Sequence, residues 1–145
     1  MKKLLAILVS TLLVVSAYAV DPKVNEKVLK SFNETFSAAE DVKWEEFQNY
    51  YTVSFNQSGI QSKVNYDHSG TMLSSLRYYA PQLLPLNIYN RIKKNYAKKE
   101  MFGVTEVTFS NEVVYYVKLQ DAKTWITLKI DGVGNAEVVE KYKKA

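Results

Sequence analysis

The sequence lacks cysteine entirely and has a single histidine among its 145 residues. Without cysteine there can be no disulfide and no lipid-modified N-terminal cysteine, so stability must come from the apolar core. One histidine without any cysteine also cannot supply the ligands of a typical zinc site. We therefore expect no structural metal.

Long hydrophobic runs are also absent, except for one at the N-terminus. Lys2 and Lys3 precede a 12-residue apolar stretch from Leu4 to Val15, and Ala17-Tyr18-Ala19 follows it. This is the pattern of a secretory signal peptide over residues 1–19, with cleavage near Ala19. A membrane helix needs roughly 20 apolar residues, so the stretch is too short for stable membrane insertion. We expect an exported protein, periplasmic or secreted.

A strong excess of charge is missing too. The formal net charge is +4, and it falls to +2 when Lys2 and Lys3 are removed with the signal peptide. The remaining basic residues gather at 91–99 and 141–144. Lysines near a helix end complement the helix dipole, and no groove-reading motif accompanies them. We expect no nucleic-acid partner.

Two short segments, YDHSG at 66–70 and IDGVG at 130–134, share a pattern at an interval of 64 residues. Each closes a run of alternating apolar residues with an Asp and a spaced Gly. Aligning the chain with itself at this interval matches apolar positions in three blocks. The matches are Val24, Val28 and Phe32 with Ile88, Ile92 and Tyr96; Tyr51, Val53 and Phe55 with Tyr115, Val117 and Leu119; and Val64 and Tyr66 with Leu128 and Ile130. With one inserted residue, Val42 and Trp44 also match Val107 and Phe109.

The matched blocks predict a tandem repeat of one helix and four short strands, over about 22–79 and about 85–142. A spacing of four favours helices, and a spacing of two favours half-buried strands. The predicted helices cover about 22–38 and 85–98, and the strands lie near 42–47, 50–56, 60–67, 71–79, 103–109, 112–119, 123–131 and 135–142. Asp67 and Gly70, like Asp131 and Gly134, are predicted to form hairpin turns.

These elements predict an α+β fold. Up to eight antiparallel strands form one sheet, and both helices cover one face of it. Residues 20–145 are enough for a single domain, for which we expect one compact core.

The other face of such a sheet is open. On some strands the alternation of apolar and polar residues shows which side chains face away from the core. The side chains expected on the open face of these strands are Tyr50, Thr52, Ser54, Lys63, Asn65, Tyr116, Lys118, Trp125, Thr127 and Lys129. Exposed aromatic residues can have a purely structural role, because they favour the strand conformation and pack against residues of neighbouring strands. They are also enriched where proteins bind partners. The partner-binding residues predicted on the second interpretation are Tyr50, Thr52, Lys63, Tyr116, Lys118, Trp125 and Lys129.

Catalytic groups do not converge in the sequence. His68 stands between Asp67 and Ser69 in a predicted turn, where neighbouring side chains diverge, whereas a triad needs close contacts. The acidic pairs at 40–41 and 45–46 are interpreted as solvated surface residues. Glu45 and Glu46 are neighbours on a predicted strand and face opposite sides, so they cannot act together on one bond as paired catalytic carboxylates do. No Gly-rich phosphate loop is present, and the turns lack a calcium-binding pattern. We predict a protein that is not an enzyme and needs no cofactor.

The order of short motifs resembles that of PepSY-like, β-lactamase-inhibitor-like (BLIP-like) exported bacterial proteins. The motifs are AEDVKWE at 39–45, YTVSF at 51–55, the YDxSG turn at 66–70, LPLxI at 84–88 and YYVKL at 115–119. The resemblance implies two repeats sharing a sheet, in a non-enzymatic domain whose relatives include inhibitors that grip an enzyme. The characterised inhibitors contain disulfides, which this chain cannot form, and none of their inhibitory loop residues can be matched here.

We therefore expect an exported module that holds a protein or peptide partner on the open face, with inhibition of an envelope enzyme as one form of this role. The alternative is a small-molecule carrier with a cavity between helices and sheet. Edge strands can pair with those of a second copy of the chain, so a homodimer is a further possibility.

Overall fold

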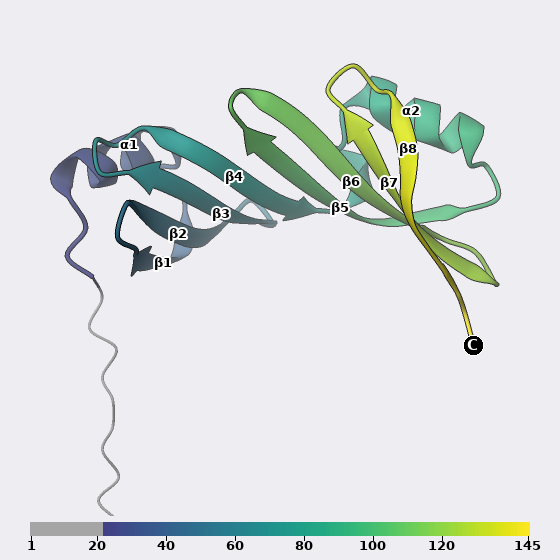
Figure 1. Cartoon of the computed structure of the whole chain (residues 1–145), viewed down its shortest axis with the longest axis horizontal. Coiled ribbons are helices and arrows are strands. Elements are labelled where there is room, and N and C mark those ends of the chain that lie inside the picture. The colour runs from purple at the N-terminus through teal and green to yellow at the C-terminus, as the bar shows by residue number, and fades with distance from the viewer. Residues whose placement is uncertain (1–21) are drawn as a thin grey trace, which may run out of the picture.

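Eight strands form one antiparallel sheet in chain order in the computed structural model, which describes residues 22–145 (Figure 1). The predicted signal peptide lies outside the described residues. The elements are α1 Glu26–Thr35, β1 Glu40–Glu46, β2 Tyr50–Gln57, β3 Ile60–Asp67, β4 Met72–Tyr79, a 3-10 turn at Pro81–Leu83, α2 Leu86–Asn95, β5 Glu100–Phe109, β6 Glu112–Gln120, β7 Thr124–Asp131 and β8 Ala136–Lys143. The predicted α+β class with an antiparallel sheet is confirmed. No helix among the described residues has the length and apolar character needed to span a bilayer.

Both helices are shorter than predicted. The side chain of Asn25 accepts a hydrogen bond of 2.9 Å from the backbone N–H of Lys27, so α1 begins after this cap and not at Pro22. Phe36 and Tyr96 leave the helical conformation at the C-terminal ends, with φ near −125° in both cases.

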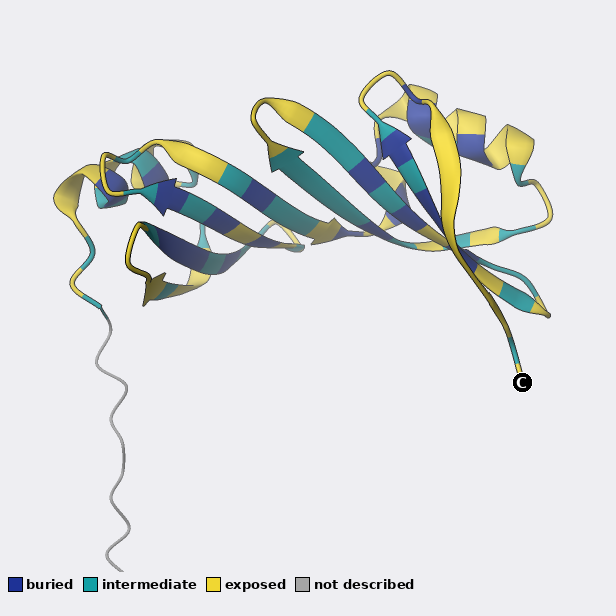
Figure 2. Ribbon diagram, in the orientation of Figure 1, coloured by how far each residue is buried: buried dark blue, intermediate teal, exposed yellow. Residues whose placement is uncertain are grey.

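The apolar core consists of two clusters, where a single one was expected. The first joins α1 to β2 and β3 through Val28, Phe32, Tyr51, Val53, Phe55, Val64 and Tyr66. The second joins α2 to β5, β6 and β7 through Ile88, Ile92, Val104, Tyr115, Val117, Leu119, Ile126, Leu128 and Ile130, with Tyr79 and Leu84. The helices lie at opposite ends of the sheet, and the buried positions gather near each of them (Figures 1 and 2). A helix is only about 10 Å wide, which is two strand spacings, so neither helix reaches the middle of the sheet.

A polar network stands between the clusters, where β4 pairs with β5. The guanidinium of Arg77 donates to Glu106 over 3.0 Å, and the Tyr79 hydroxyl donates to the same carboxylate over 2.6 Å. The Glu106 side chain is only 13% exposed. The carboxylate therefore has a hydrogen-bond donor for each oxygen, as a largely buried charge requires.

The two turns predicted from the Asp and Gly pattern are confirmed. Gly70 and Gly134 have φ of +90° and +93°. One carboxylate oxygen of Asp67 accepts the backbone N–H of Thr71 at 2.9 Å, and the corresponding oxygen of Asp131 accepts that of Asn135 at 2.8 Å.

The spacing between the helices differs from the alignment made on the sequence. Helices α1 and α2 begin 60 residues apart, at Glu26 and Leu86. The buried pair Val28 and Phe32 therefore occupies the same helical positions as Ile88 and Ile92, and the alignment of these helices at 64 residues is wrong by about one turn. From β3 and β7 onward the interval is 64, because these strands begin at Ile60 and Thr124.

The difference of four residues lies in the hairpin formed by β5 and β6. Trp44 pairs with Val53 in the first hairpin, and Val104 pairs with Val117 in the second. Phe47 and Tyr50 close the β1–β2 hairpin, with a hydrogen bond of 2.9 Å from the Phe47 N–H to the Tyr50 carbonyl oxygen. With this pair counted, the β5–β6 hairpin continues beyond this point for two more residue pairs than the β1–β2 hairpin. Trp44 therefore matches Val104, and its predicted match with Phe109 is wrong.

Candidate functional site

We call the side of the sheet that carries Ser54 and Lys63 the open face. Adjacent residues of a strand point to opposite sides, so the open face is opposite to the side of Val53 and Val64. Directly paired residues share a face, and one row of pairs crosses the sheet through Lys43, Ser54, Lys63, Leu76, Val107 and Val114. The next row contains Asn56, Gln61, Tyr78, Thr105, Tyr116 and Lys129.

The partner-binding residues predicted from the sequence fall into two groups on this face. Tyr50, Thr52 and Lys63 lie on β2 and β3. Tyr116, Lys118, Trp125 and Lys129 lie on β6 and β7. Strands β4 and β5 separate the groups, so about 14 Å lies between β3 and β6 at the usual strand spacing. The structure brings each group together but leaves the two groups apart.

Two of the residues expected on the open face lie there but are buried. Thr52 is 4% exposed, and its hydroxyl donates to the side-chain amide oxygen of Asn65 over 2.6 Å. Thr127 is also buried, and it donates to Glu140 over 2.7 Å. They are buried because a short side chain between longer neighbours on a sheet is covered by them.

The outer aromatic residues are held by their own neighbours. Trp125 is 43% exposed, its ring N–H donates to Gln120 over 3.2 Å, and the Lys144 ammonium lies 5.0 Å from the centre of its ring. Tyr50 stacks on Phe47 with ring centres 4.7 Å apart. These contacts account for much of their placement without a partner.

The middle of the open face carries apolar side chains, of which the sequence predicts only Tyr116. Leu76 and Tyr78 on β4 lie beside Val107 on β5, with Val114 and Tyr116 next to it on β6. We call these five residues the central strip. Tyr78 is 45% exposed, and the other four are half-buried. Leu76 and Tyr78 alternate along β4, which is a signal for this strip, but local alternation does not fix the side of the sheet to which β4 or Val107 turns these side chains.

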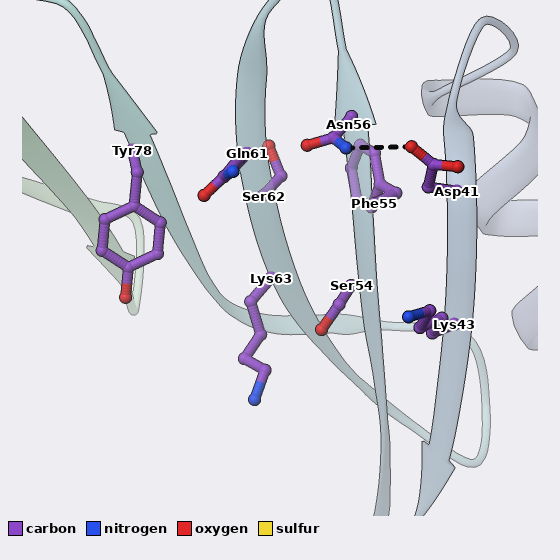
Figure 3. A pocket seen from close by; sticks show the side chains of 9 residues that line it. All are labelled: Asp41, Lys43, Ser54, Phe55, Asn56, Gln61, Ser62, Lys63 and Tyr78. Carbon is purple, nitrogen blue, oxygen red and sulfur yellow. Dashed lines mark hydrogen bonds between the residues drawn. The ribbon is translucent and has the colours of Figure 1, made fainter.

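A hollow of about 560 Å³ opens beside the central strip on the first four strands (Figure 3). Lys43 and Lys63 flank the short side chain of Ser54, and Tyr78 borders the far side (Figure 3). The remaining lining residues are Asp41, Phe55, Asn56, Gln61 and Ser62.

Two carboxylates near this hollow contact neighbouring side chains. The Asn56 amide donates to Asp41 over 3.2 Å. Lys63 approaches Glu45 only to 3.9 Å, and the two side chains are 47% and 60% exposed, so this ion pair is weak. Among residues 22–145 no ion pair involves Lys43.

The space between α2 and the sheet is nearly filled. A cavity of about 10 Å³ lies there, lined by Ile88, Ile92, Tyr96 and Ile130 among others. This volume is about the size needed for one water molecule. A larger groove of about 420 Å³ is placed beside the first cluster, where Phe36, Ser62, Ser75 and Glu106 line it.

The residues tested for catalysis do not converge. His68 is exposed, as predicted for a turn residue, and its ring nitrogen lies 3.2 Å from the carbonyl oxygen of Gln48. Ser69 donates instead to Asp67 over 2.6 Å. The part of the chain that the structure describes holds no group of three or more His, Cys, Asp or Glu residues suited to a metal ion.

The shifted pKa values belong to structural groups. Burial raises the pKa of Tyr66 to about 12. Burial, followed by the hydrogen bond to Glu106, raises the pKa of Tyr79 as well. Both phenols lie in the apolar clusters, so the charge of the open face depends on its lysines and carboxylates.

Comparison with known proteins identifies solved structures of similar fold. No family model matches the chain, and no curated protein matches it. A BLIP-like protein from Bacteroides fragilis is 16% identical, with a TM-score of 0.60 over 88% of this chain and 89% of its own. A DUF2874 family protein from Bacteroides uniformis is 20% identical, with a TM-score of 0.57 over 81% of this chain and 88% of its own. A predicted periplasmic protein from Bacteroides eggerthii is 13% identical, with a TM-score of 0.58 over 84% of this chain and 90% of its own. At these identities the likeness establishes a BLIP-like fold.

Proposed function

We propose that this protein is an exported, non-enzymatic binding module that holds a protein or peptide partner on its open face. The observation that carries this proposal is the central strip, where aliphatic and aromatic side chains gather on a sheet face without a covering helix. Exposed apolar patches with tyrosine commonly mark interaction sites. Inhibition of an envelope enzyme is one form that this binding can take.

The similar solved structures support the proposal in two respects. One of them is described as BLIP-like and another as a predicted periplasmic protein. Export through a signal peptide over residues 1–19 places this chain in the same compartment under the proposal. A homodimer through the exposed edge strand β8 is a further form that binding can take.

The proposal includes a tandem arrangement, with residues 22–79 and 85–142 as repeats whose helices share one face. Phe55 of the first cluster and Tyr115 of the second stand in the same row of pairs, through Ser62, Arg77 and Glu106. Directly paired residues point to the same side, which supports a shared face. The matching turns at Gly70 and Gly134 support the repeat.

The carrier alternative has weaker support. The small cavity below α2 cannot accept a ligand larger than water, and no residue of α1 or α2 lines the groove near Ser75.

Affinity capture from an envelope extract tests the proposed function. We expect immobilised wild-type protein to retain a partner that Tyr78→Ala and Tyr116→Ala variants retain at least tenfold less. Leu86→Ala is the control, because Leu86 is exposed on α2 and distant from the strip. Equal retention by all variants would exclude the open face as the binding surface.

A further inference from the structure

We propose that the hollow around Ser54 is a carboxylate subsite, so that the partner is an acidic protein segment inserting an Asp or Glu side chain between Lys43 and Lys63. This inference rests on the proposed function, since it specifies the chemistry of the partner at the same face.

The register of the sheet builds this subsite. Lys43, Ser54 and Lys63 are directly paired on β1, β2 and β3, so the lysines stand two strands apart, or about 10 Å between Cα atoms. The short serine between them leaves the space that a larger side chain would fill. Flexible lysine side chains can reach across such a distance to a shared anion.

The charge of the hollow is suited to a carboxylate. Two lysines, Lys43 and Lys63, line the hollow against the single carboxylate of Asp41, which accepts a hydrogen bond from Asn56. The contact of Lys63 with Glu45 is long and exposed. An incoming carboxylate would meet two ammonium groups and the hydroxyl of Ser54. Hydrogen bonds between charged donors and carboxylates are roughly twice as strong as neutral ones.

The hollow is continuous with the central strip. Tyr78 lines the hollow and also belongs to the strip, and Leu76 is directly paired with Lys63. The strip thus begins about 5 Å from the second lysine. A segment that fits both features carries an aromatic or aliphatic anchor for the strip and an acidic residue within about 10 Å of it.

Selection from a random 12-residue peptide library displayed on phage tests this inference on the protein purified from the periplasm of an expression host. We expect the selected peptides to be enriched in Asp or Glu near an apolar residue. Resynthesised peptides with Asp→Asn and Glu→Gln changes should bind at least tenfold more weakly.

Charge variants of the protein locate the effect. The Lys43→Gln/Lys63→Gln variant should bind the acidic peptides about fivefold more weakly than the wild type. The Lys43→Glu/Lys63→Glu variant should bind them at least tenfold more weakly, and both losses in affinity should become smaller at high salt. The control Lys93→Glu/Lys94→Glu makes the same change on the outer surface of α2 and should alter affinity less than twofold. Thermal unfolding confirms that each variant is folded.

The outcomes separate the inference from the proposed function. If Tyr116→Ala weakens peptide binding while the Lys43 and Lys63 variants do not, the subsite is overturned and the binding face stands. Selected peptides without acidic enrichment would overturn the subsite as well. Tighter binding of a poly-dT oligonucleotide than of the acidic peptides would overturn the class of partner. If no peptide is selected, or if none of the substitutions on the open face alters peptide affinity, both proposals are wrong.

Discussion

At the residue scale, Asp67 and Asp131 each organise a hairpin with one carboxylate. The hydroxyl of Ser69 and then the backbone N–H of Thr71 lower the pKa of Asp67. The backbone N–H of Asn135, followed by its side chain, lowers the pKa of Asp131. These hydrogen bonds favour the ionised carboxylate in the folded state.

Acid should therefore destabilise the fold through these two turns. A folded-state pKa below the unfolded value contributes stability above the unfolded pKa, near 3.9 for Asp, and this stability is lost as the pH falls through the folded pKa. We expect the thermal unfolding temperature to fall below about pH 4, and to fall less steeply in the Asp67→Asn/Asp131→Asn variant. Differential scanning calorimetry across pH 2 to 7 gives the comparison, and identical slopes would contradict it.

At the element scale, the turn between β3 and β4 packs directly against α1. A Cβ atom added to Gly70 would lie 2.8 Å from the carbonyl oxygen of Lys27 and 2.8 Å from the hydroxyl of Ser31. Gly59, in the turn between β2 and β3, also has a positive φ, but a Cβ atom there would meet open space. Substitutions at the two glycines therefore distinguish the cost of a positive φ, which both positions share, from the cost of a steric clash, which only Gly70 has.

Gly70→Ala should destabilise the protein more than Gly59→Ala. A left-handed residue other than glycine costs about 1 kcal/mol, which is the whole cost expected at Gly59. At Gly70 the clash with a backbone carbonyl adds about 1–3 kcal/mol. Urea denaturation followed by circular dichroism measures both, and equal losses would mean that α1 moves away from the turn without penalty.

Strands and turns could be predicted from the sequence where the pattern of apolar and turn residues was compatible with a single structure. Alternation in β2 and β7 placed Tyr51 and Ile130 in the core, and the Asp and Gly pairs predicted both turns. The helices could not be aligned uniquely, because a shift of four residues is close to one turn and preserves the same apolar face.

The central part of the candidate site could not be predicted for a related reason. Assigning Val107 to a face requires the length of the β5–β6 hairpin, which local alternation does not contain. Because the alignment matches Val107 with Val42, the sequence predicts neither the central strip nor a role for Lys43. Tyr116 and Lys63 were identified because their strands alternate clearly.

At the scale of the whole molecule, the network of Arg77, Tyr79 and Glu106 joins two halves that have separate apolar clusters. The sheet is continuous across β4 and β5, so backbone pairing and this network connect the clusters at the sheet's centre. A largely buried carboxylate is costly once its partner is removed.

Substitutions in this network should therefore destabilise the whole protein. We expect Arg77→Met to cost about 1–3 kcal/mol, because the largely buried Glu106 carboxylate loses its cationic partner. Glu106→Gln should cost about 1 kcal/mol, because the arginine left unpaired is more exposed, and the double variant should cost less than the sum. The exposed Lys30–Glu34 pair, at 3.9 Å, is the control and should contribute less than about 0.5 kcal/mol. A double-mutant cycle in urea measures the coupling, and strict additivity would show that Arg77 and Glu106 act independently.

The longer β5–β6 hairpin constrains how homologous chains can vary in length. Between the Val104–Val117 pair and the turn, each of its arms is two residues longer than the corresponding arm between the Trp44–Val53 pair and the turn at Phe47 and Tyr50. This even number returns every side chain to its original side. A single-residue insertion in one arm would invert the parity of that arm and turn Val104 toward solvent. Insertions and deletions tolerated in this hairpin should accordingly come in twos on each arm, or be absorbed by a bulge.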